Sequence, residues 1–380
     1  MSLSVDISHR LGAFTLEAAF ESSGRLTALF GPSGSGKTTL VNLIGGLLRP
    51  ERGAISCDGR VLVDTASGVF VPKHKRRIGY VFQDARLFPH MTVDQNLRYG
   101  RFFAPPTERT GSTADVVDLL GIGHLLDRGP GSLSGGEKQR VAIGRALLAS
   151  PKLILMDEPL ASLDERRKAE IMPYIERLRD ETGIPIVYVS HSIAEVARLA
   201  TDMVVLDAGK VAAAGTAADL LQRLDLLPDE ERDEGGAVFE MQVKSRDEAF
   251  GMSLLTSPVG EIHVAELDAE TGTTVRVRIR ARDIMVATER PRGISALNVL
   301  PGRIAALGTG TGPFADVTID CNGQEIAARI TRQSAATLGL TLGMAVFAVV
   351  KSVTFDRRNT ARTAAGASLP RGTTSNPLVS

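Results

Sequence analysis

The sequence has few of the features that mark secreted, membrane-spanning or nucleic-acid-binding proteins. Its two cysteines, Cys57 and Cys321, lie far apart and lack metal-site spacing, so we expect buried thiols in a reducing compartment. The 44 basic residues are balanced by 44 acidic ones, which argues against nucleic acid or an anionic membrane as an electrostatic partner. The longest apolar run, about residues 338–350, is interrupted by glycine and too short to span a bilayer. No basic segment followed by an apolar one opens the sequence, so we expect no signal peptide and a cytoplasmic protein.

The sequence does contain a phosphate-binding loop between a predicted strand and a predicted helix. Residues 31–38, GPSGSGKT, have the G-x-x-x-x-G-K-[ST] spacing of a P-loop. This spacing would arise by accident in such a chain only about 1% of the time. Residues 25–30 predict a buried strand, and residues 38–48 predict a helix whose N-terminus faces the phosphates. The predicted phosphate-binding residues are Gly31, Pro32, Ser33, Gly34, Ser35, Gly36, Lys37, Thr38 and Thr39.

Within this loop, the residue types suit different tasks. The glycines would let backbone N–H groups turn inward around the β- and γ-phosphates, and Lys37 would add a positive charge. The Thr38 hydroxyl would hold Mg²⁺. Asp157 ends a buried apolar strand at residues 153–156, so its carboxylate should lie near the P-loop and hold Mg²⁺ through water. Glu158 is the candidate for polarising the attacking water, although an acidic pair after a strand can also be a helix N-cap.

Several motifs occur in an order that is typical of one family. After the P-loop come the sequence LSGGEKQ at residues 133–139, the pair Asp157 and Glu158 within 153–159, the sequence SLD at 162–164, and His191. In this order the chain resembles the nucleotide-binding subunits of ABC transporters over about residues 1–230. The resemblance implies ATP and Mg²⁺ as cofactors.

The resemblance also implies roles that the residues alone do not assign. Gln83, directly after a predicted strand at 78–82, would contact Mg²⁺ and the water, and its loop would sense a membrane subunit. His191, after a predicted strand at 184–189, would contact the γ-phosphate. The predicted catalytic residues are therefore Glu158, His191 and Gln83, and the predicted Mg²⁺ ligands are Thr38, Gln83 and Asp157. A metal site made of His191 and Glu195 lacks an evident third ligand.

The LSGGEKQ signature is expected to act across a dimer. Ser134, Gly135 and Gly136 open a helix, and their bare N–H groups could receive an anion. The alternative is an ordinary helix capped by the S-x-x-E box of Ser134 and Glu137. In the family, the signature of one copy faces the P-loop of a second copy in a head-to-tail dimer, and Asp164 would lie at the same seam. These four residues, Ser134, Gly135, Gly136 and Asp164, complete the predicted ATP site.

One position departs from the family. Relatives usually stack the adenine on an aromatic residue upstream of the P-loop, often followed by glycine. Here Leu11 and Gly12 take that place, and Phe14 is the nearest aromatic residue. The residue that would stack on the base is therefore not identified by the sequence.

The composition divides the chain into three regions. Residues 1–236 predict an α/β P-loop ABC ATPase cassette with a helical insertion at about 92–127 and an acidic connector at 225–236, which we expect to be solvated. Residues 237–355 predict a small all-β domain, because apolar residues alternate there, and a family resemblance described below implies that it is OB-like. Residues 356–380 are rich in small and polar residues and are expected to be disordered.

Two details of the β-rich region carry separate expectations. Val275, Val277 and Ile279 alternate with three arginines at 276, 278 and 280, for which a solvated strand face is favoured over an anion surface. Asn322-Gly323 between alternating apolar stretches predicts a β-hairpin.

The C-terminal region narrows the resemblance. Residues 294–302, 330–334 and 343–353 resemble a molybdate-binding (Mop or TOBE) domain with a core at about 293–355, and residues 79–90 resemble molybdate-importer ATPases. The candidate oxyanion ligands are Ser295, Asn298, Ser334, Lys351 and Ser352. Leu297 departs from the pattern, because many Mop domains have arginine there. The alternative is a β-domain that only dimerises the subunit.

The resemblance implies an ATP-hydrolysing subunit of an importer that energises molybdate uptake through a separate integral membrane permease. The subunit would be peripheral at the cytoplasmic face of the cell membrane, and a periplasmic or extracellular binding protein would be an indirect partner. Related importers of tungstate, sulfate, ferric iron or polyamine remain alternatives. So do a soluble cassette ATPase acting on ribosomes or DNA and an oxyanion storage protein, although no second cassette or coiled coil is evident and no nucleic-acid partner is expected.

Overall fold

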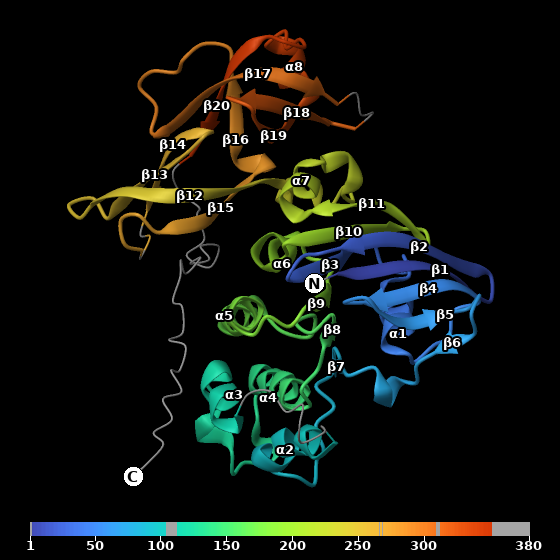
Figure 1. Cartoon of the computed structure of the whole chain (residues 1–380). Coiled ribbons are helices and arrows are strands. Elements are labelled where there is room, and N and C mark those ends of the chain that lie inside the picture. Colours follow the sequence, from blue (N-terminus) through green and yellow to red (C-terminus); the bar gives the residue numbers. More distant parts are fainter. Residues whose placement is uncertain (1, 104–111, 266, 268, 309–311, 352–380) are drawn as a thin grey trace, which may run out of the picture.

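The computed structural model describes residues 2–103, 112–265, 267, 269–308 and 312–351. The prolines at 105 and 106, Ser352 and the tail at 356–380 lie outside these residues. The described strands form three sheets that succeed one another along the chain (Figure 1). The sheet that carries the P-loop is mixed, and the other two are antiparallel.

The large sheet has parallel strands at one side and antiparallel strands at the other. Its order is β6-β5-β4-β1-β2-β11-β10-β3-β9-β8-β7. Strands β3, β8 and β9 consist almost entirely of buried apolar residues, as expected for strands that are covered on both faces. The strands are β1 (Leu3–Leu11), β2 (Phe14–Ser22), β3 (Leu26–Phe30), β4 (Arg52–Cys57), β5 (Arg60–Asp64), β6 (Val69–Phe70), β7 (Ile78–Val81), β8 (Leu153–Asp157), β9 (Ile186–Val189), β10 (Asp202–Asp207) and β11 (Lys210–Thr216).

Helices cover both faces of this sheet, and a separate helical group lies at one end of the molecule (Figure 1). Helix α1 packs on one face, where its apolar residues share a core with β1 and β2. Helices α4, α5, α6 and α7 share the other core. The predicted helical insertion is confirmed by α2 and α3. The helices are α1 (Lys37–Gly45), α2 (Val93–Phe103), α3 (Thr113–Leu120), α4 (Gly135–Leu148), α5 (Glu165–Glu181), α6 (Ile193–Leu199) and α7 (Ala217–Gln222).

The C-terminal region consists of two small antiparallel sheets around one apolar core. Their orders are β14-β13-β12-β15 and β16-β20-β17-β18-β19. The predicted hairpin is confirmed: Cys321 pairs with Gln324, and the turn residues Asn322 and Gly323 have φ of 58° and 80°. The elements are β12 (Gly236–Asp247), β13 (Met252–Ser257), β14 (Gly260–Ala265), β15 (Thr274–Arg280), β16 (Ile284–Ala287), β17 (Asn298–Leu307), β18 (Phe314–Cys321), β19 (Gln324–Thr331), α8 (Arg332–Thr337) and β20 (Ala345–Val350).

The arginine stripe of β15 faces the cassette, so the prediction of a solvated strand face was wrong. Arg278 is 7% exposed, and Arg276 is partly buried and donates to the carbonyl of Ala200 at 2.8 Å. Alternation along a strand identifies two faces, but it does not show whether the polar face meets water or another part of the chain.

The acidic connector also differs from its prediction. It contains two short 3₁₀ turns, at Leu224–Leu226 and Arg232–Glu234, and two of its carboxylates, those of Asp233 and Glu234, pair with arginines of the β-rich region. Glu234 accepts from Arg278 and Arg282, and Asp233 lies 3.0 Å from Arg329. The connector is therefore an ion-paired joint and not a solvated linker.

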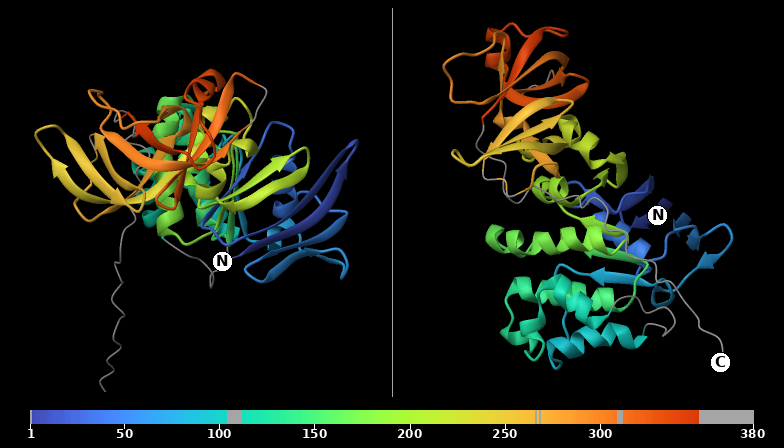
Figure 2. Two further views of the ribbon diagram at one scale, coloured as in Figure 1. Left: turned by 90° about the horizontal axis from the view of Figure 1, so that it is seen from above. Right: turned by 60° about the vertical axis from the view of Figure 1, so that its left-hand side comes forward.

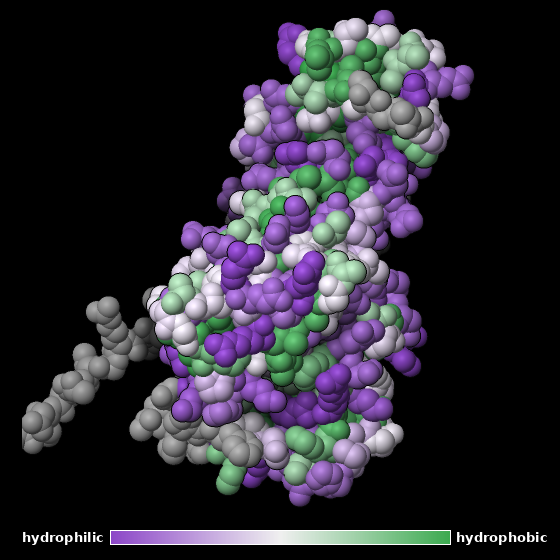
Figure 3. All heavy atoms as spheres, turned by 90° about the vertical axis from the view of Figure 1, so that its right-hand side faces the viewer, coloured by the Kyte–Doolittle hydropathy of each residue, from purple (hydrophilic) through white to green (hydrophobic). Residues whose placement is uncertain are grey.

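The molecule is elongated, with the β-rich sheets at one end and the helices α2, α3 and α4 at the other (Figure 2). Hydrophilic residues spread along the face shown in Figure 3, with apolar residues in small groups among them. Among the described residues, no helix has the length and apolar character that crossing a membrane requires.

Candidate functional site

The P-loop connects β3 to α1 at the carboxyl end of the central strands. Gly31, Gly34 and Gly36 all have positive φ, and Gly36 is the N-cap of α1. A Cβ atom at Gly31 would lie 2.0 Å from the carbonyl oxygen of Leu206, so only glycine fits there. Three residues of the loop, Pro32, Ser33 and Gly34, are exposed, which leaves their backbone accessible.

Lys37 lies inside this loop. Its Nζ donates to the carbonyls of Gly31 at 2.7 Å and Pro32 at 2.8 Å, and the residue is only 5% exposed. Burial lowers the pKa of the Lys37 ammonium, while the charges of Glu158 and Asp157 act in the opposite direction. The nearby Ser35 hydroxyl is buried and has no hydrogen-bond partner among the described residues. The loop thus presents a buried cation and an unpaired hydroxyl, which suits an anionic ligand.

Asp157 ends β8 beside the first turn of α1. Its Oδ1 accepts from the Thr38 hydroxyl at 3.3 Å, and its Oδ2 accepts from the Tyr80 hydroxyl at 3.4 Å. Burial raises the pKa of the Asp157 carboxyl above its usual value, and the hydrogen bond from Thr38 partly offsets this. The oxygens of Thr38 and Asp157 therefore lie together, and hard oxygen donors are what Mg²⁺ prefers.

Glu158 and His191 meet at the same edge of the sheet. Glu158 Oε2 lies 3.6 Å from His191 Nδ1, and the His191 side chain is 55% exposed. Glu158 has φ of 47°, a left-handed conformation that is unusual for a residue other than glycine. Its N–H donates to the carbonyl of Val189 at 3.2 Å, which helps to hold this conformation.

Gln83 follows β7 at the same edge. Strand β7 runs parallel to β8, with Val81 beside Met156, so Gln83, two residues after β7, and Asp157, the last residue of β8, lie at the same end of adjacent strands. The Gln83 side chain is exposed. The structure therefore places six of the predicted site residues at one edge of the sheet, and their roles stay predictions: Lys37, Thr38, Gln83, Asp157, Glu158 and His191.

The signature residues lie elsewhere in the cassette. Ser134 Oγ accepts from the N–H of Glu137 at 3.3 Å, and Glu137 accepts in return from Ser134 N–H at 2.7 Å, which confirms the predicted capping box of α4. A Cβ at Gly135 would lie 2.8 Å from Leu163, so the signature packs against the loop before α5. In the described part of the chain, no hydrogen bond or ion pair joins residues 134–136 to the P-loop.

Asp164 has a local partner of its own. Its Oδ1 accepts from the N–H of Arg167 at 2.9 Å, so it is the N-cap of α5.

Phe14 lies under the P-loop. Cβ atoms at Gly36 and Gly209 would each lie 3.1 Å from the tip of its ring, so the ring is wedged between these two backbones. Leu11, the last residue of β1, is 43% exposed. Neither residue is assigned to adenine by this geometry.

Sequence reasoning missed a polar network behind His191. Glu195 is 6% exposed and accepts from the hydroxyls of Tyr188 at 2.9 Å and Ser190 at 2.8 Å. It also pairs with Lys168 of α5 at 3.2 Å. These partners occupy Glu195, so it supports the loop of His191 and does not form a metal pair with it. The sequence shows a glutamate one helical turn after His191, but it does not show that this glutamate is buried.

The candidate oxyanion residues are spread over the β-rich region. Asn298 is 1% exposed, and its amide bonds the backbone N–H and carbonyl of His263 at 2.7 and 3.1 Å. Ser295 and Lys351 are exposed near the same end of β17, because Asn298 pairs with Val350. Ser334 lies in α8, which follows β19 at the opposite end of the sheet. The structure therefore does not gather these residues into one pocket within the chain.

Comparisons with known proteins agree with this geometry. Residues 20–161 match the family model of the ABC transporter, and residues 294–354 match that of the TOBE domain. The molybdenum import ATP-binding protein of Mesorhizobium japonicum is 68% identical over 97% of this chain and 99% of its own length. That of Rhizobium etli is 56% identical over 94% of this chain and its entire length.

A solved dimeric ATP-binding cassette bound to ADP and phosphate is 28% identical, covers 57% of this chain and 99% of its own, and has a TM-score of 0.48. The identities over nearly the full length of the two curated relatives establish the family. The chain belongs to the ABC transporter ATPases, within the family of the molybdenum import ATP-binding proteins.

Proposed function

We propose that this chain hydrolyses ATP to energise the uptake of molybdate through a separate membrane permease. The observation that carries the proposal is the convergence of Lys37, Asp157, Glu158 and His191 at one edge of the sheet. The cargo is inferred from the relatives, whose names describe molybdenum import. Related cargoes such as tungstate and sulfate remain the alternatives that an uptake assay separates.

ATP would bind with its β- and γ-phosphates in the P-loop. The loop's backbone N–H groups and the Lys37 ammonium would provide positive charge for the phosphates. Strand β3, which precedes the loop, would not need to rearrange. Lys37 is already buried against the loop, so little conformational entropy is lost when it turns to a phosphate.

Thr38 and Asp157 are the residues that would hold Mg²⁺, with Gln83 beside them. Their oxygens fit this ion because Thr38 Oγ1 and Asp157 Oδ1 lie 3.3 Å apart in a position that solvent can reach. When bound, Mg²⁺ neutralises charge on the β- and γ-phosphates.

Glu158 would orient and polarise the attacking water. Its strained backbone and the bond to Val189 fix the carboxylate at the strand end. His191, 3.6 Å away and largely exposed, is placed to contact the γ-phosphate beside that water.

A second copy of the chain would complete each site. In the described residues, no hydrogen bond or ion pair joins the signature residues 134–136 to the P-loop of their own chain, yet their N–H groups open α4. A head-to-tail dimer, with Asp164 at the seam, would bring each signature to the other copy's ATP. The permease would dock at the loop of Gln83, and the chain would sit peripherally at the cytoplasmic face of the membrane.

The β-rich region would bind oxyanion or pair two subunits. Ser295, Asn298 and Lys351 lie near one end of β17, and Ser334 lies at the other end of the sheet, so a pocket that includes them all would form between two domains. Titration of the whole chain with molybdate in a calorimeter would test this role, and no heat above that of buffer would exclude it.

Uptake of labelled molybdate and sulfate by cells with and without this chain tests the function. We expect molybdate accumulation to depend on the chain and on Glu158. If sulfate uptake alone depends on it, the proposed cargo is wrong. If neither does, the importer function is wrong.

A further inference from the structure

Helix α6 begins two residues after His191, and its position fixes the loop that carries this histidine. Glu195 of α6 accepts from the Ser190 hydroxyl at 2.8 Å. Ser190 Oγ in turn accepts from the N–H of Ser192 at 3.0 Å. The residues on both sides of His191 are thus bonded to each other and to α6, so a shift of the helix would move His191.

The connector is hydrogen-bonded to the N-terminal end of this helix. Glu231 Oε2 accepts from the N–H of Ile193, the first residue of α6, at 3.3 Å. Burial raises the pKa of the Glu231 carboxyl, and the charge of His191 is among the groups that lower it, so the two side chains lie within electrostatic reach.

The same connector is tied to the β-rich region. Arg278 of β15 donates to both the backbone carbonyl and the carboxylate of Glu234. Arg282 lies 2.6 Å from Glu234, and Arg329 of β19 lies 3.0 Å from Asp233. The carbonyl of Glu231 accepts from the N–H of Glu234, so the two residues share one turn. The carboxylate of Glu231 should therefore move when the β-rich region moves.

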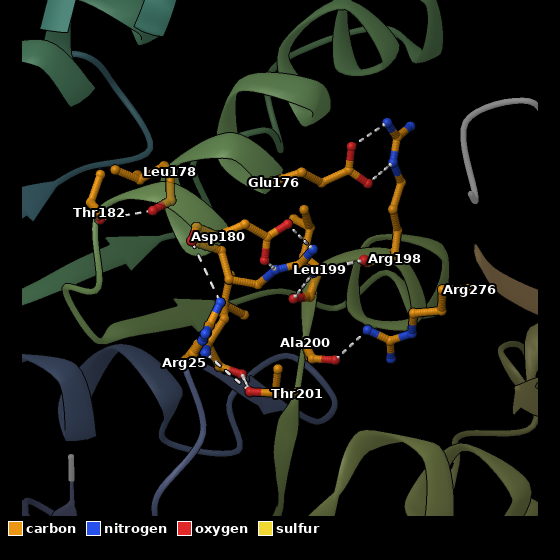
Figure 4. Close-up of polar contacts among 12 residues, drawn as sticks. Arg25, Glu176, Leu178, Asp180, Thr182, Arg198, Leu199, Ala200, Thr201 and Arg276 are labelled. Atoms are coloured by element: carbon orange, nitrogen blue, oxygen red, sulfur yellow. Dashed lines mark hydrogen bonds and ion pairs between the residues drawn. The ribbon is translucent and has the colours of Figure 1, made fainter. Parts of the chain in front are cut away.

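The C-terminal end of α6 is held by the β-rich region directly. Arg276 of β15 donates to the carbonyl of Ala200, the C-cap of α6, at 2.8 Å (Figure 4). On the cassette side, Glu176 of α5 pairs with Arg198 at 2.7 Å (Figure 4). Arg179 of α5 donates to the carbonyl of Leu199 at 2.9 Å. Helix α6 therefore lies between α5 and β15 and is bonded to both.

We propose that α6 transmits the position of the β-rich region to His191, with Glu231 and Arg276 as its positioning residues. The inference rests on the proposed ATPase function. Neither residue touches ATP in this scheme. Glu231 sets the start of α6 and Arg276 its end, so that a movement of the β-rich region, for example on binding a ligand, changes the placement of His191 and hence the rate of hydrolysis.

The test compares Glu231→Ala with Glu231→Gln and with Glu230→Ala in the whole chain. Glu230 is the exposed neighbour, so its variant is a matched control. We expect kcat for ATP hydrolysis to fall about tenfold in Glu231→Ala, the typical effect of losing a hydrogen bond to a charged group. KM for ATP should stay within about twofold, because the P-loop is untouched. Glu231→Gln keeps an acceptor oxygen and should recover most of the rate.

Hydrogen exchange supplies a readout that does not depend on activity. Amides at the start of α6 should exchange faster in Glu231→Ala than in Glu230→Ala, with the P-loop helix unchanged. Arg276→Ala should accelerate exchange at the end of α6, with Arg246→Ala, an exposed arginine of β12, as its control.

The outcomes separate this inference from the proposed function. If the unaltered chain and Glu230→Ala hydrolyse ATP while Glu231→Ala matches them in kcat and in α6 exchange, the inference is wrong and the ATPase stands. If the unaltered chain does not hydrolyse ATP, the proposed function is wrong, and exchange alone then decides whether Glu231 holds α6.

Discussion

Glu158 combines backbone strain with a position beside His191 and Lys37. A left-handed glutamate costs on the order of 1–3 kcal/mol, and the fold retains it where its carboxylate meets the predicted γ-phosphate site. Replacing Glu158 by Gln keeps the shape but removes the charge that polarises water. We expect ATP hydrolysis to fall by about 10²–10⁴-fold while ATP binding persists. Phosphate release and binding of a fluorescent ATP analogue would measure the two effects.

Glu170→Gln is the control for this substitution. Glu170 lies on α5 with a side chain 66% exposed, paired only loosely with Arg166 at 3.7 Å. Its variant should hydrolyse ATP as the unaltered chain does. A Glu158→Gln variant that matches Glu170→Gln in rate would contradict the role assigned to Glu158.

The two thiols should be unreactive in the folded chain. Burial, assisted by Asp58 and Asp320 respectively, raises the pKa of Cys57 and of Cys321 to about 11. Only the thiolate attacks disulfide reagents, and at pH 8 roughly one thiol in a thousand would be ionised. Reaction with an aromatic disulfide reagent should therefore be slow at pH 8 and accelerate about tenfold per pH unit as the pH rises toward 11.

Unfolding in denaturant is the control for this measurement, since it should release two fast thiols. Cys321, which is fully buried, should react more slowly than the partly buried Cys57. Fast stoichiometric reaction of the folded chain at pH 8 would show that these sites open to solvent.

Helices α3 and α4 of the cassette both begin with a serine capping box. Comparing the two serines therefore separates a capping role from a role in ATP hydrolysis. Ser112 caps α3 and Ser134 caps α4, each in a reciprocal box with the acidic residue three positions on. Replacement of either serine by alanine should cost about 1 kcal/mol of the free energy of unfolding, as measured in urea. Only Ser134→Ala should also reduce ATP hydrolysis, by about tenfold, because its hydroxyl would face the partner's nucleotide.

Equal ATPase rates in the two serine variants would leave Ser134 as a cap and nothing more. A larger loss of stability in one variant can be distinguished from a loss of function by assaying both well below their melting temperatures.

Local patterns predicted the elements that depend on local causes. The P-loop strand and helix, the capping box of α4 and the hairpin at Asn322 all follow from neighbouring residues, whose backbone and hydrogen-bond preferences act within a few positions. Strands β8 and β9 were also predicted from local sequence, because an unbroken apolar run is typical of a strand that is buried on both faces of a sheet.

Patterns failed where two distant segments meet. The alternation of β15 gave no sign that Arg276 would reach the end of α6, 76 residues earlier, or that Arg278 would meet Glu234, 44 residues earlier. Charge runs carry no information about their partners until the fold is known. Glu195 was missed for the same reason, since its burial depends on Lys168 and Tyr188 from other elements.

At the scale of the whole molecule, the cassette and the β-rich region share both charge pairs and apolar core. Val238, Ala281 and Ala327 from the C-terminal region are buried within the core that α4 to α7 form. This joint makes the two regions move together near α6, whereas the P-loop and the signature remain on separate parts of the cassette. Under the proposed mechanism, the signature would meet ATP only in another chain.

Mixing two inactive variants would test whether that other chain is a second copy. Lys37→Ala disables the P-loop, and Ser134→Arg blocks the signature. In a head-to-tail dimer of one variant with the other, both lesions fall in one site and the second site is intact. In a 1:1 mixture whose subunits exchange freely, half of the chains should be in mixed dimers. Each mixed dimer has one intact site of two, so the mixture should recover about a quarter of the normal number of sites.

ATP hydrolysis by the mixture, compared with each variant alone, is the measurement. If each site were built within one chain, both variants would remain defective in every pairing, and the mixture would show only the average of the two rates. The same mixture prepared with Lys37→Ala and Glu158→Gln gives the control, because those two residues lie in the same half-site and the signature of both partners is normal. That pairing leaves each site with one lesion and should recover nothing. Recovery confined to the first mixture would therefore place the signature and the P-loop of one working site on two different copies.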